Sequence, residues 1–189
     1  LNNHPEISEA TKIAVHKLAK ELNYHPNAIA LSLKHSRSNI IGLIIPELTH
    51  YFFSTVISGI EDVAYDANFN VMLCQSNELY FREVKNTEAL LASRIDGLLV
   101  SVSKDTKDYA HFKHVLDSNI PIVFFDRIVE ELETDRVIAD DYKSSYQAVD
   151  HLIKLGKRRI AHLGTNPEIN IGKNRLNGYR DALRDNNIQ

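Results

Sequence analysis

Short apolar runs alternate with amphipathic stretches over most of the chain. The runs are rich in Ile, Leu, Val and Phe: Ile40–Ile45, Val71–Cys74, Gly97–Val102, Ile120–Phe125, Val137–Ala139 and Ile160–Leu163. Apolar residues at helical spacing lie between and after them, near 53–67, 80–93, 106–118, 143–155 and 173–186. Strands that alternate with helices predict an α/β fold with a doubly wound parallel sheet. Because the apolar runs are unbroken, we expect the strands to be covered on both faces.

The first part of the chain has a different, purely helical pattern. Residues 9–22 place their apolar residues on one face, and Ser8 is a candidate N-cap. Pro26 blocks continuation of this helix, and Asn27 can cap a second helix at about 28–34. A helix this short is well below the roughly 12–15 residues needed for marginal stability in water. We therefore expect it to fold only against a partner.

These patterns divide the chain into four expected parts. They are the end of a helical bundle (1–26), a short helix with a polar linker (27–38), an α/β lobe (39–156) and the start of a second lobe (157–189). Gly156 marks the boundary between the lobes because glycine commonly ends a helix. One further strand and helix do not make a second domain, so we expect both ends to continue in a larger protein.

Bulk properties favour a cytoplasmic globular protein. The 189 residues are 43% hydrophobic and 25% charged, which is typical of a soluble domain. A single cysteine, Cys74, excludes an internal disulfide framework and fits a reducing compartment. No apolar run approaches the roughly 20 residues that span a bilayer, and Leu1–Pro5 does not resemble a signal peptide. We therefore expect no membrane association.

The formal charge of −3 is unevenly distributed along the chain. Residues 1–38 carry five Lys or Arg against three Asp or Glu, a net charge of +2, so the remaining residues carry −5. A basic front on an acidic body suits a DNA-contacting head on a sensing domain. Ordinary variation of surface charge explains the same numbers equally well.

Enzyme motifs are not found in the sequence. The seven glycines form neither a dinucleotide fingerprint nor a Walker loop, and no Gly-x-Ser-x-Gly motif occurs. His111 and His114 lie three residues apart on a predicted helix and could begin a metal site. Further ligands are not evident, so a solvated helix face is the favoured interpretation. We expect no catalytic residues, no metal and no cofactor.

The ends of the strands supply the candidate ligand site. In open α/β sheets, ligands bind beyond the carboxyl ends of the strands. The residues expected there are Phe52, Phe53, Gln75, Ser76, Ser103, Asp126, Arg127 and Asp140, with Arg175 early in the last helix. The two phenylalanines could stack on a sugar or base, and the charged residues could form paired hydrogen bonds with hydroxyls. Core packing of Phe53 and a surface ion pair of Asp126 with Arg127 are the alternatives.

The stretch from Tyr24 to Leu33 carries a resemblance to a known family. It matches the pattern Tyr-x-Pro-Asn-x-x-Ala-x-x-Leu and is followed by the strand Ile40–Ile45. This arrangement resembles the lactose-repressor (LacI/GalR-type) family of bacterial transcription regulators, and the resemblance covers essentially the whole chain. It implies a periplasmic-binding-protein-type fold behind a helix-turn-helix headpiece and a hinge helix.

The resemblance implies roles for residues at both sites. Tyr24 and Asn27 would contact phosphates and the groove, Ala30 would allow close approach to the minor groove, and Leu33 would wedge between base pairs. Three more expected phosphate contacts are Asn2, Ser8 and Thr11. The effector motifs of the family resemble Pro46-x-x-x-x-x-Phe52-Phe53, Phe125-Asp126-Arg127 and Arg175-Leu176-x-Gly178-Tyr179.

The function implied is that of a transcriptional regulator, most simply a repressor, controlled by a small-molecule effector. It would bind double-stranded operator DNA as a homodimer, and its effector would be a carbohydrate or a derivative. A periplasmic sugar-binding protein of the same architecture is the main alternative, and it would have no use for residues 8–34. An enzyme of doubly wound type is the third, but the expected strand ends offer it no nucleophile.

Overall fold

The computed structural model describes residues 5–24, 37–49 and 51–188. The chain forms two compact units, Leu1–Asn39 and Ile40–Gln189, which are described separately. The expected short helix at about 28–34 lies outside the described residues. The same holds for four predicted DNA contacts, Asn2, Asn27, Ala30 and Leu33.

The first unit contains helix α1 (Glu9–Glu21). Its predicted N-cap is confirmed, because the Ser8 Oγ atom accepts a hydrogen bond from the Thr11 backbone N–H at 3.3 Å. No residue of α1 is buried, and Ile13 and Leu22 are exposed by 67% and 69%. The apolar face of α1 is therefore open within the described part of this unit.

The second unit is built on a five-stranded sheet with the order β2-β1-β3-β4-β5. Every pairing is parallel, which confirms the predicted doubly wound α/β fold. Its strands are β1 (Ile40–Ile45), β2 (Asn70–Gln75), β3 (Gly97–Val100), β4 (Ile122–Phe125) and β5 (Asp135–Val137). Its helices are α3 (Tyr51–Asp66), α4 (Tyr80–Ala92), α5 (Ala110–Asp117), α6 (Asp141–Lys154) and α7 (Asn170–Asp185).

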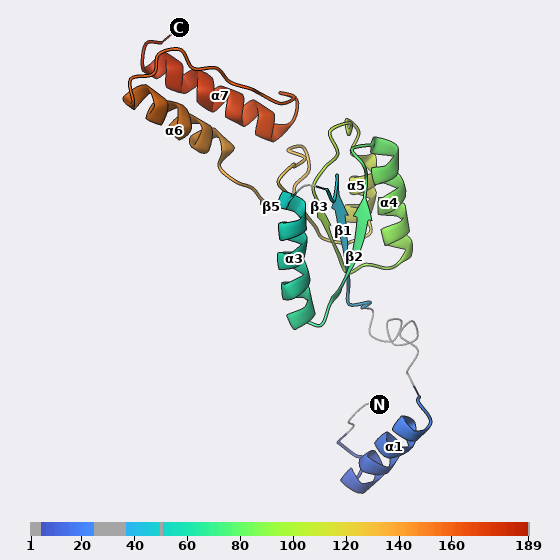
Figure 1. The fold of residues 1–189 in the computed structure, drawn as a ribbon. Coiled ribbons are helices and arrows are strands. Elements are labelled where there is room, and N and C mark those ends of the chain that lie inside the picture. Colours follow the sequence, from blue (N-terminus) through green and yellow to red (C-terminus); the bar gives the residue numbers. More distant parts are fainter. Residues whose placement is uncertain (1–4, 25–36, 50, 189) are drawn as a thin grey trace. The chain divides into compact units, whose positions relative to one another are not determined.

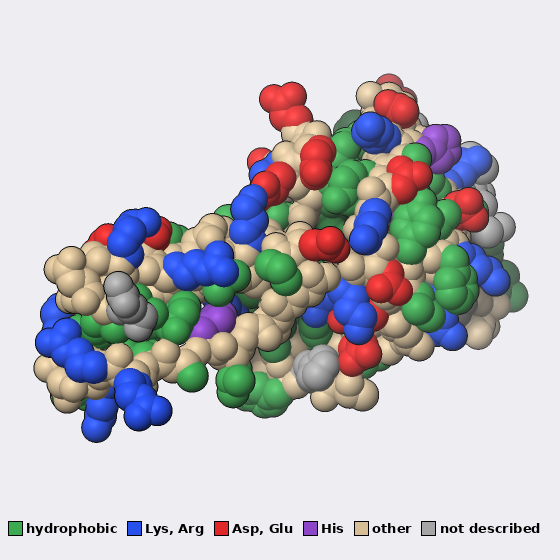
Figure 2. Space-filling model, turned by 90° about the horizontal axis from the view of Figure 1, so that it is seen from above, with side chains coloured by type: hydrophobic (Ala, Val, Ile, Leu, Met, Phe, Trp, Pro, Cys, Tyr) green, Lys and Arg blue, Asp and Glu red, His purple; other side chains and the backbone are tan. Residues whose placement is uncertain are grey.

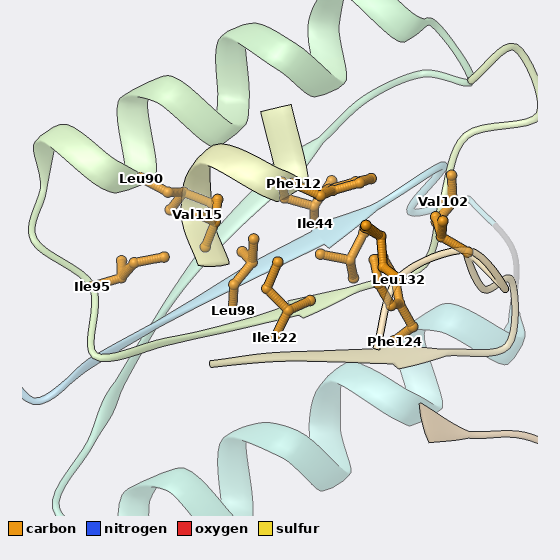
Figure 3. Packing of buried hydrophobic residues seen from close by; sticks show 12 residues of the cluster. Ile44, Leu90, Ile95, Leu98, Val102, Phe112, Val115, Ile122, Phe124 and Leu132 are labelled. Atoms are coloured by element: carbon orange, nitrogen blue, oxygen red, sulfur yellow. The ribbon is translucent and has the colours of Figure 1, made fainter. Parts of the chain in front are cut away.

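The central strands divide the core into two clusters, one on each face of the sheet. On one face, Leu90 of α4 and Phe112 and Val115 of α5 pack on Leu98 and other residues of the central strands (Figure 3). On the other face, α3 packs against β1 and β4 in a second, smaller cluster. The crossover helices therefore flank the sheet and leave the loops beyond the strand ends free to form a site.

Two expectations about strands need correction. Ile160–Leu163 is not a strand, and Leu163 is 99% exposed, because a strand needs a hydrogen-bonding neighbour and none is described beside this segment. The strand expected at Val137–Ala139 begins two residues earlier, as β5 (Asp135–Val137), an edge strand with all its residues exposed, and Met72 of the other edge strand, β2, is 36% exposed. Only the central strands have the two-sided burial that the unbroken apolar runs predict.

The last two helices pack closely against each other (Figure 1). Val149 and Ile153 of α6 bury Ala182 of α7, and Gly156 follows α6 in the left-handed conformation (φ +80°). Gly178 allows the close approach, because a Cβ atom at this position would overlap the backbone oxygen of Tyr142. Gly178, which belongs to the sequence motif that begins at Arg175, is therefore needed for the packing of α7 against α6.

The surface mixes charged and apolar side chains. The face in Figure 2 shows hydrophobic side chains open to solvent between Lys, Arg, Asp and Glu. Within the described ranges, no helix combines the length and the apolar character needed to cross a membrane.

We expect Gly178→Ala to lower the free energy of unfolding by about 1–3 kcal/mol, as overpacking of a filled interface does. Gly59→Ala is the matched control. Gly59 lies in α3, and a Cβ atom added there would meet no other atom within 4 Å, so alanine should add up to about 1 kcal/mol through its higher helix propensity. Urea denaturation followed by circular dichroism measures both. Equal effects of the two substitutions would contradict the close packing of α6 on α7.

Candidate functional site

A cavity of about 250 Å³ lies beyond the carboxyl end of the sheet. Its walls come from three segments that are distant in sequence: residues 102–109 after β3, Arg127 and Ile128 after β4, and residues 168–170 at the start of α7. Polar groups alternate with apolar ones along these walls, among them Lys104, Tyr109 and Asn170. The sheet topology therefore places a mixed polar and apolar cavity where open α/β folds bind ligands.

Arg127 lines this cavity and forms an ion pair with Glu78. Its Nη1 atom lies 2.8 and 2.7 Å from the two carboxylate oxygens of Glu78, and both side chains are largely buried. The expected alternative, a surface pair of Arg127 with Asp126, is therefore not what is observed. Glu78 also accepts a hydrogen bond from the Lys104 backbone N–H at 2.9 Å. Sequence reasoning missed Glu78, because nothing in the turn after β2 distinguishes it from a solvated acid.

Ser103 belongs to a buried polar network around Glu83. Glu83 lies in α4 and is fully buried, and it accepts hydrogen bonds from the backbone N–H and the hydroxyl of Ser103 at 2.8 and 2.9 Å. The hydroxyls of Ser103 and Ser76 lie 2.6 Å apart. Thr106 donates to the other carboxylate oxygen of Glu83 at 2.7 Å. This network was missed in the sequence, although positions 83, 87 and 90 share the buried face of α4.

His111 also belongs to this network, and its expected place on a solvated face is wrong. The residue is 8% exposed, and its Nε2 atom lies 3.1 Å from Glu83 Oε1. Its Nδ1 atom has no hydrogen-bond partner in the described part of the chain. Because Nε2 faces a carboxylate acceptor, we assign a proton to Nε2, which donates this hydrogen bond. His114 of the same helix is exposed, as expected.

Asp126 occupies a strained position at the end of β4. Its backbone has φ +60°, a left-handed conformation that is uncommon for residues other than glycine. Burial raises the pKa of its carboxyl, and the charge of Arg127 and a hydrogen bond from Ser101 offset part of this shift. Asn170 of α7 donates to the Asp126 backbone oxygen at 3.1 Å. Backbone strain and an unfavourably buried carboxyl together are typical of functional sites.

The two phenylalanines predicted to stack on a ligand differ in burial. Phe53 is 4% exposed and packs with Leu43, Ile45 and Ile57, so it has the core role that was the alternative. Phe52 is 50% exposed and makes an edge-to-face contact with Phe53 at 5.2 Å between ring centroids. Ligand contact by either ring stays a prediction, and Phe52 offers the accessible face.

The other candidates lie around the same edge of the sheet. The side chain of Gln75 donates to that of Asn77 in the turn after β2. Asp140 is the N-cap of α6 and accepts from the Lys143 backbone N–H at 2.9 Å, a structural role that the sequence did not indicate. Arg175 Nε donates to Asp141 at 2.7 Å, and its Nη atoms form no hydrogen bond with the described residues. The cavity walls themselves include only Ser103 and Arg127 among the predicted effector contacts.

A second hollow, of about 440 Å³, lies between α3 and the sheet. Every residue that lines it is apolar, so it offers no side chain that could orient a polar ligand. Among the described residues, no three His, Cys, Asp or Glu side chains are grouped so that they could hold a metal ion. Cys74 is partly buried, and this burial raises the pKa of its thiol, which makes it a poor nucleophile. The cavity beyond β3 and β4 is therefore the candidate site.

Both the sequence and the fold are similar to those of known proteins. Residues 38–188 match the family described as periplasmic binding proteins and sugar binding domain of LacI family. The transcriptional repressor PurR of Vibrio atlanticus (strain LGP32) is 32% identical over 190 residues, which cover 100% of this chain and 56% of that protein. The regulator GalR of Escherichia coli (strain K12) is 30% identical over 196 residues, with 100% and 54% covered.

A solved structure of the lac repressor dimer bound to operator and the anti-inducer ONPF gives a TM-score of 0.84 at 25% identity. The match covers 100% of this chain and 57% of that one. The chain thus spans about half the length of the curated relatives that it matches. These relatives are described as transcriptional regulators.

We expect Asp126→Asn to raise the free energy of unfolding at pH 7. The folded state raises the pKa of Asp126, so ionisation at neutral pH opposes folding, and protonation at lower pH removes this cost. Asparagine also tolerates the left-handed backbone. The gain should therefore shrink as the pH falls from 7 toward 4 in urea denaturation. Asp117→Asn makes the same change at an exposed position of α5 and is the matched control. If Asp126→Asn raises the free energy of unfolding at pH 7 no more than Asp117→Asn does, the prediction is wrong.

Proposed function

The chain belongs to the family of periplasmic binding proteins and sugar binding domains of LacI regulators, and on this premise we propose that it is part of an effector-controlled transcriptional repressor. The observation that carries the proposal is the cavity at the carboxyl end of the sheet, to which the start of α7 contributes. A ligand in this cavity would be bound by Ile128 after β4 and by Asn170 of α7, which lie 42 residues apart. Ligand binding can therefore change the position of the start of α7 relative to the loop after β4.

The cavity supports a small polar effector, with a carbohydrate or a derivative as its class. Arg127 and Asn170 present hydrogen-bond donors at the cavity, and Asp126 lies next to them as an acceptor. Such donor and acceptor pairs suit the vicinal hydroxyls of a sugar. Tyr109 and Ile128 supply apolar wall for the faces of a ring. Arg175 and Phe52, both exposed at the same edge of the sheet, are proposed to complete the effector contacts.

The first unit is proposed to contact operator DNA. Ser8 and Thr11 are exposed at the N-terminus of α1, where backbone N–H groups and hydroxyls favour a phosphate. Tyr24 is 59% exposed at the end of the same segment. Asn27, Ala30 and Leu33 are proposed to follow it into the minor groove as a hinge helix. The open apolar face of α1 is consistent with a helix that belongs to a larger headpiece.

Allosteric control would couple the two sites through the short hinge helix. A homodimer would hold two such helices on a pseudo-palindromic operator, and effector binding would favour or disfavour their folding. Because a helix of this length is marginal by itself, a coupling of about 1–3 kcal/mol is sufficient. A cytoplasmic location follows from this function. The alternative, a periplasmic sugar-binding protein, gives no role to the capped helix α1, and the relatives described above do not favour it.

We expect Arg175→Gln to weaken effector binding about 10- to 100-fold, which is the usual cost of losing a charged hydrogen bond. Isothermal titration of the full-length protein against pentoses, hexoses, disaccharides, sugar phosphates and nucleobases first identifies the ligand. Arg180→Gln, an exposed position of the same helix, is the matched control and should leave the affinity unchanged. If the two variants bind the effector with equal affinity, Arg175 does not contact the effector. If no compound in the panel binds, the proposed effector class is wrong.

The hinge proposal has its own test at Leu33. We expect Leu33→Ala in the full-length protein to weaken operator binding at least about tenfold, because the wedge that opens the base step is lost. Fluorescence anisotropy with labelled operator DNA at fixed salt concentration measures this. Effector affinity and thermal stability should stay as in the wild type. An unchanged operator affinity would rule out the wedge role.

A further inference from the structure

Two carboxylates, Glu78 in the turn before α4 and Glu83 in the first turn of α4, accept hydrogen bonds from successive backbone amides of one cavity wall. Glu83 accepts from the N–H of Ser103 at 2.8 Å, and Glu78 accepts from the N–H of Lys104 at 2.9 Å. Both amides belong to the segment 102–109 that lines the cavity. This segment contains no regular secondary structure before α5, so side chains rather than a strand or helix fix its path.

Glu83 fixes the deeper side of this wall. Its carboxylate is fully buried, and its two oxygens accept from Ser103, Thr106 and His111, which belong to the 102–109 segment and to α5. A buried carboxylate without donors is strongly unfavourable, so these groups must stay near it for the fold to persist. The hydroxyls of Ser103 and Thr106 both donate to Glu83, so Glu83 fixes the orientation of two cavity-lining side chains.

Glu78 contacts two walls of the cavity: Lys104 of the 102–109 segment and Arg127 after β4. Besides Lys104, it holds the guanidinium of Arg127 through both carboxylate oxygens. Glu78 lies in the turn after β2, and its backbone has φ +61°, a left-handed conformation. One residue thus connects the loop after β3 to the loop after β4.

We propose that Glu78 and Glu83 are the positioning residues of the effector cavity. Together they form a carboxylate clamp that sets the spacing between the 102–109 wall and Arg127, and hence the size of ligand that the cavity accepts. The inference rests on the proposed function, since it concerns the same cavity. It assigns the two acids no contact with the ligand.

Hydrogen exchange of single amides, measured by NMR on the 189-residue chain, tests the clamp without a ligand. We expect Glu83→Ala to accelerate exchange at Ser103 and Glu78→Ala to accelerate it at Lys104, each about 10- to 100-fold. Protected amides of the central sheet, such as Leu43 and Leu99, should change far less. Glu88→Ala removes an exposed acid of the same helix and is the matched control. The Glu78 side chain keeps 12% exposure whereas that of Glu83 has none, so the Glu78 variant keeps the test decisive if Glu83→Ala does not fold.

A local acceleration at Ser103 and Lys104 supports the clamp. Unchanged exchange there, or an equal acceleration at all core amides, overturns it, because the acids would then be dispensable or merely structural. Isothermal titration of the full-length Glu78→Ala and Glu88→Ala variants with the compound panel separates the two proposals. We expect Glu78→Ala to change the ratio of affinities between small and large sugars, while Glu88→Ala leaves it unchanged. If the wild type binds none of the compounds, the proposed function fails while the exchange result still decides whether the clamp exists.

Discussion

Two-sided burial of the central strands is the constraint on which the second unit depends. β1, β3 and β4 are apolar along both faces, so each face needs a helical cover, and parallel neighbours can only be joined by crossovers. This arrangement places every loop that follows a strand at one edge of the sheet. The cavity walls 102–109 and Arg127–Ile128 are two of these loops. The position of the site therefore follows from the packing of the core, before any polar residue is considered.

The polar residues around the cavity satisfy one another instead of facing free solvent. Arg127 is paired with Glu78, Ser103 with Glu83, and the Asp126 backbone with Asn170. Such pairing keeps donors and acceptors in fixed directions, which lowers the ordering cost of binding a polar ligand. Asp126 is less well accommodated, although Ser101 donates to its carboxylate and Asn170 to its backbone oxygen. Its strained backbone and raised carboxyl pKa reduce stability, and a residue of this kind is retained more readily for binding than for folding.

The alternation of apolar runs and amphipathic stretches was sufficient to predict the parallel sheet and its helices. It failed for Ile160–Leu163, because periodicity reports how apolar a segment is and not whether a neighbouring strand exists. Among the residues that line the cavity, the sequence singled out Ser103 and Arg127 by their place after a strand. It missed Glu78 and Glu83, whose partners in the 102–109 wall lie 26 and 20 residues away, and no local pattern encodes such distances. His111 was misplaced for a related reason: its burial follows from facing Glu83, a contact between two helices.

Glu83 is visible in the sequence as an acid on the face of α4 that is expected to be apolar. Residues 83, 87 and 90 form the buried face of α4, so an acid and a threonine replace apolar residues on the face that should be apolar. An acid on such a face must find donors from another element, and the nearest candidates are the serine and threonine hydroxyls of loops after the strands. In the structure, Ser103 and Thr106 of the 102–109 segment supply these donors. Deviations from an amphipathic pattern are therefore more informative about a site than the pattern itself, which only determines where the site can be.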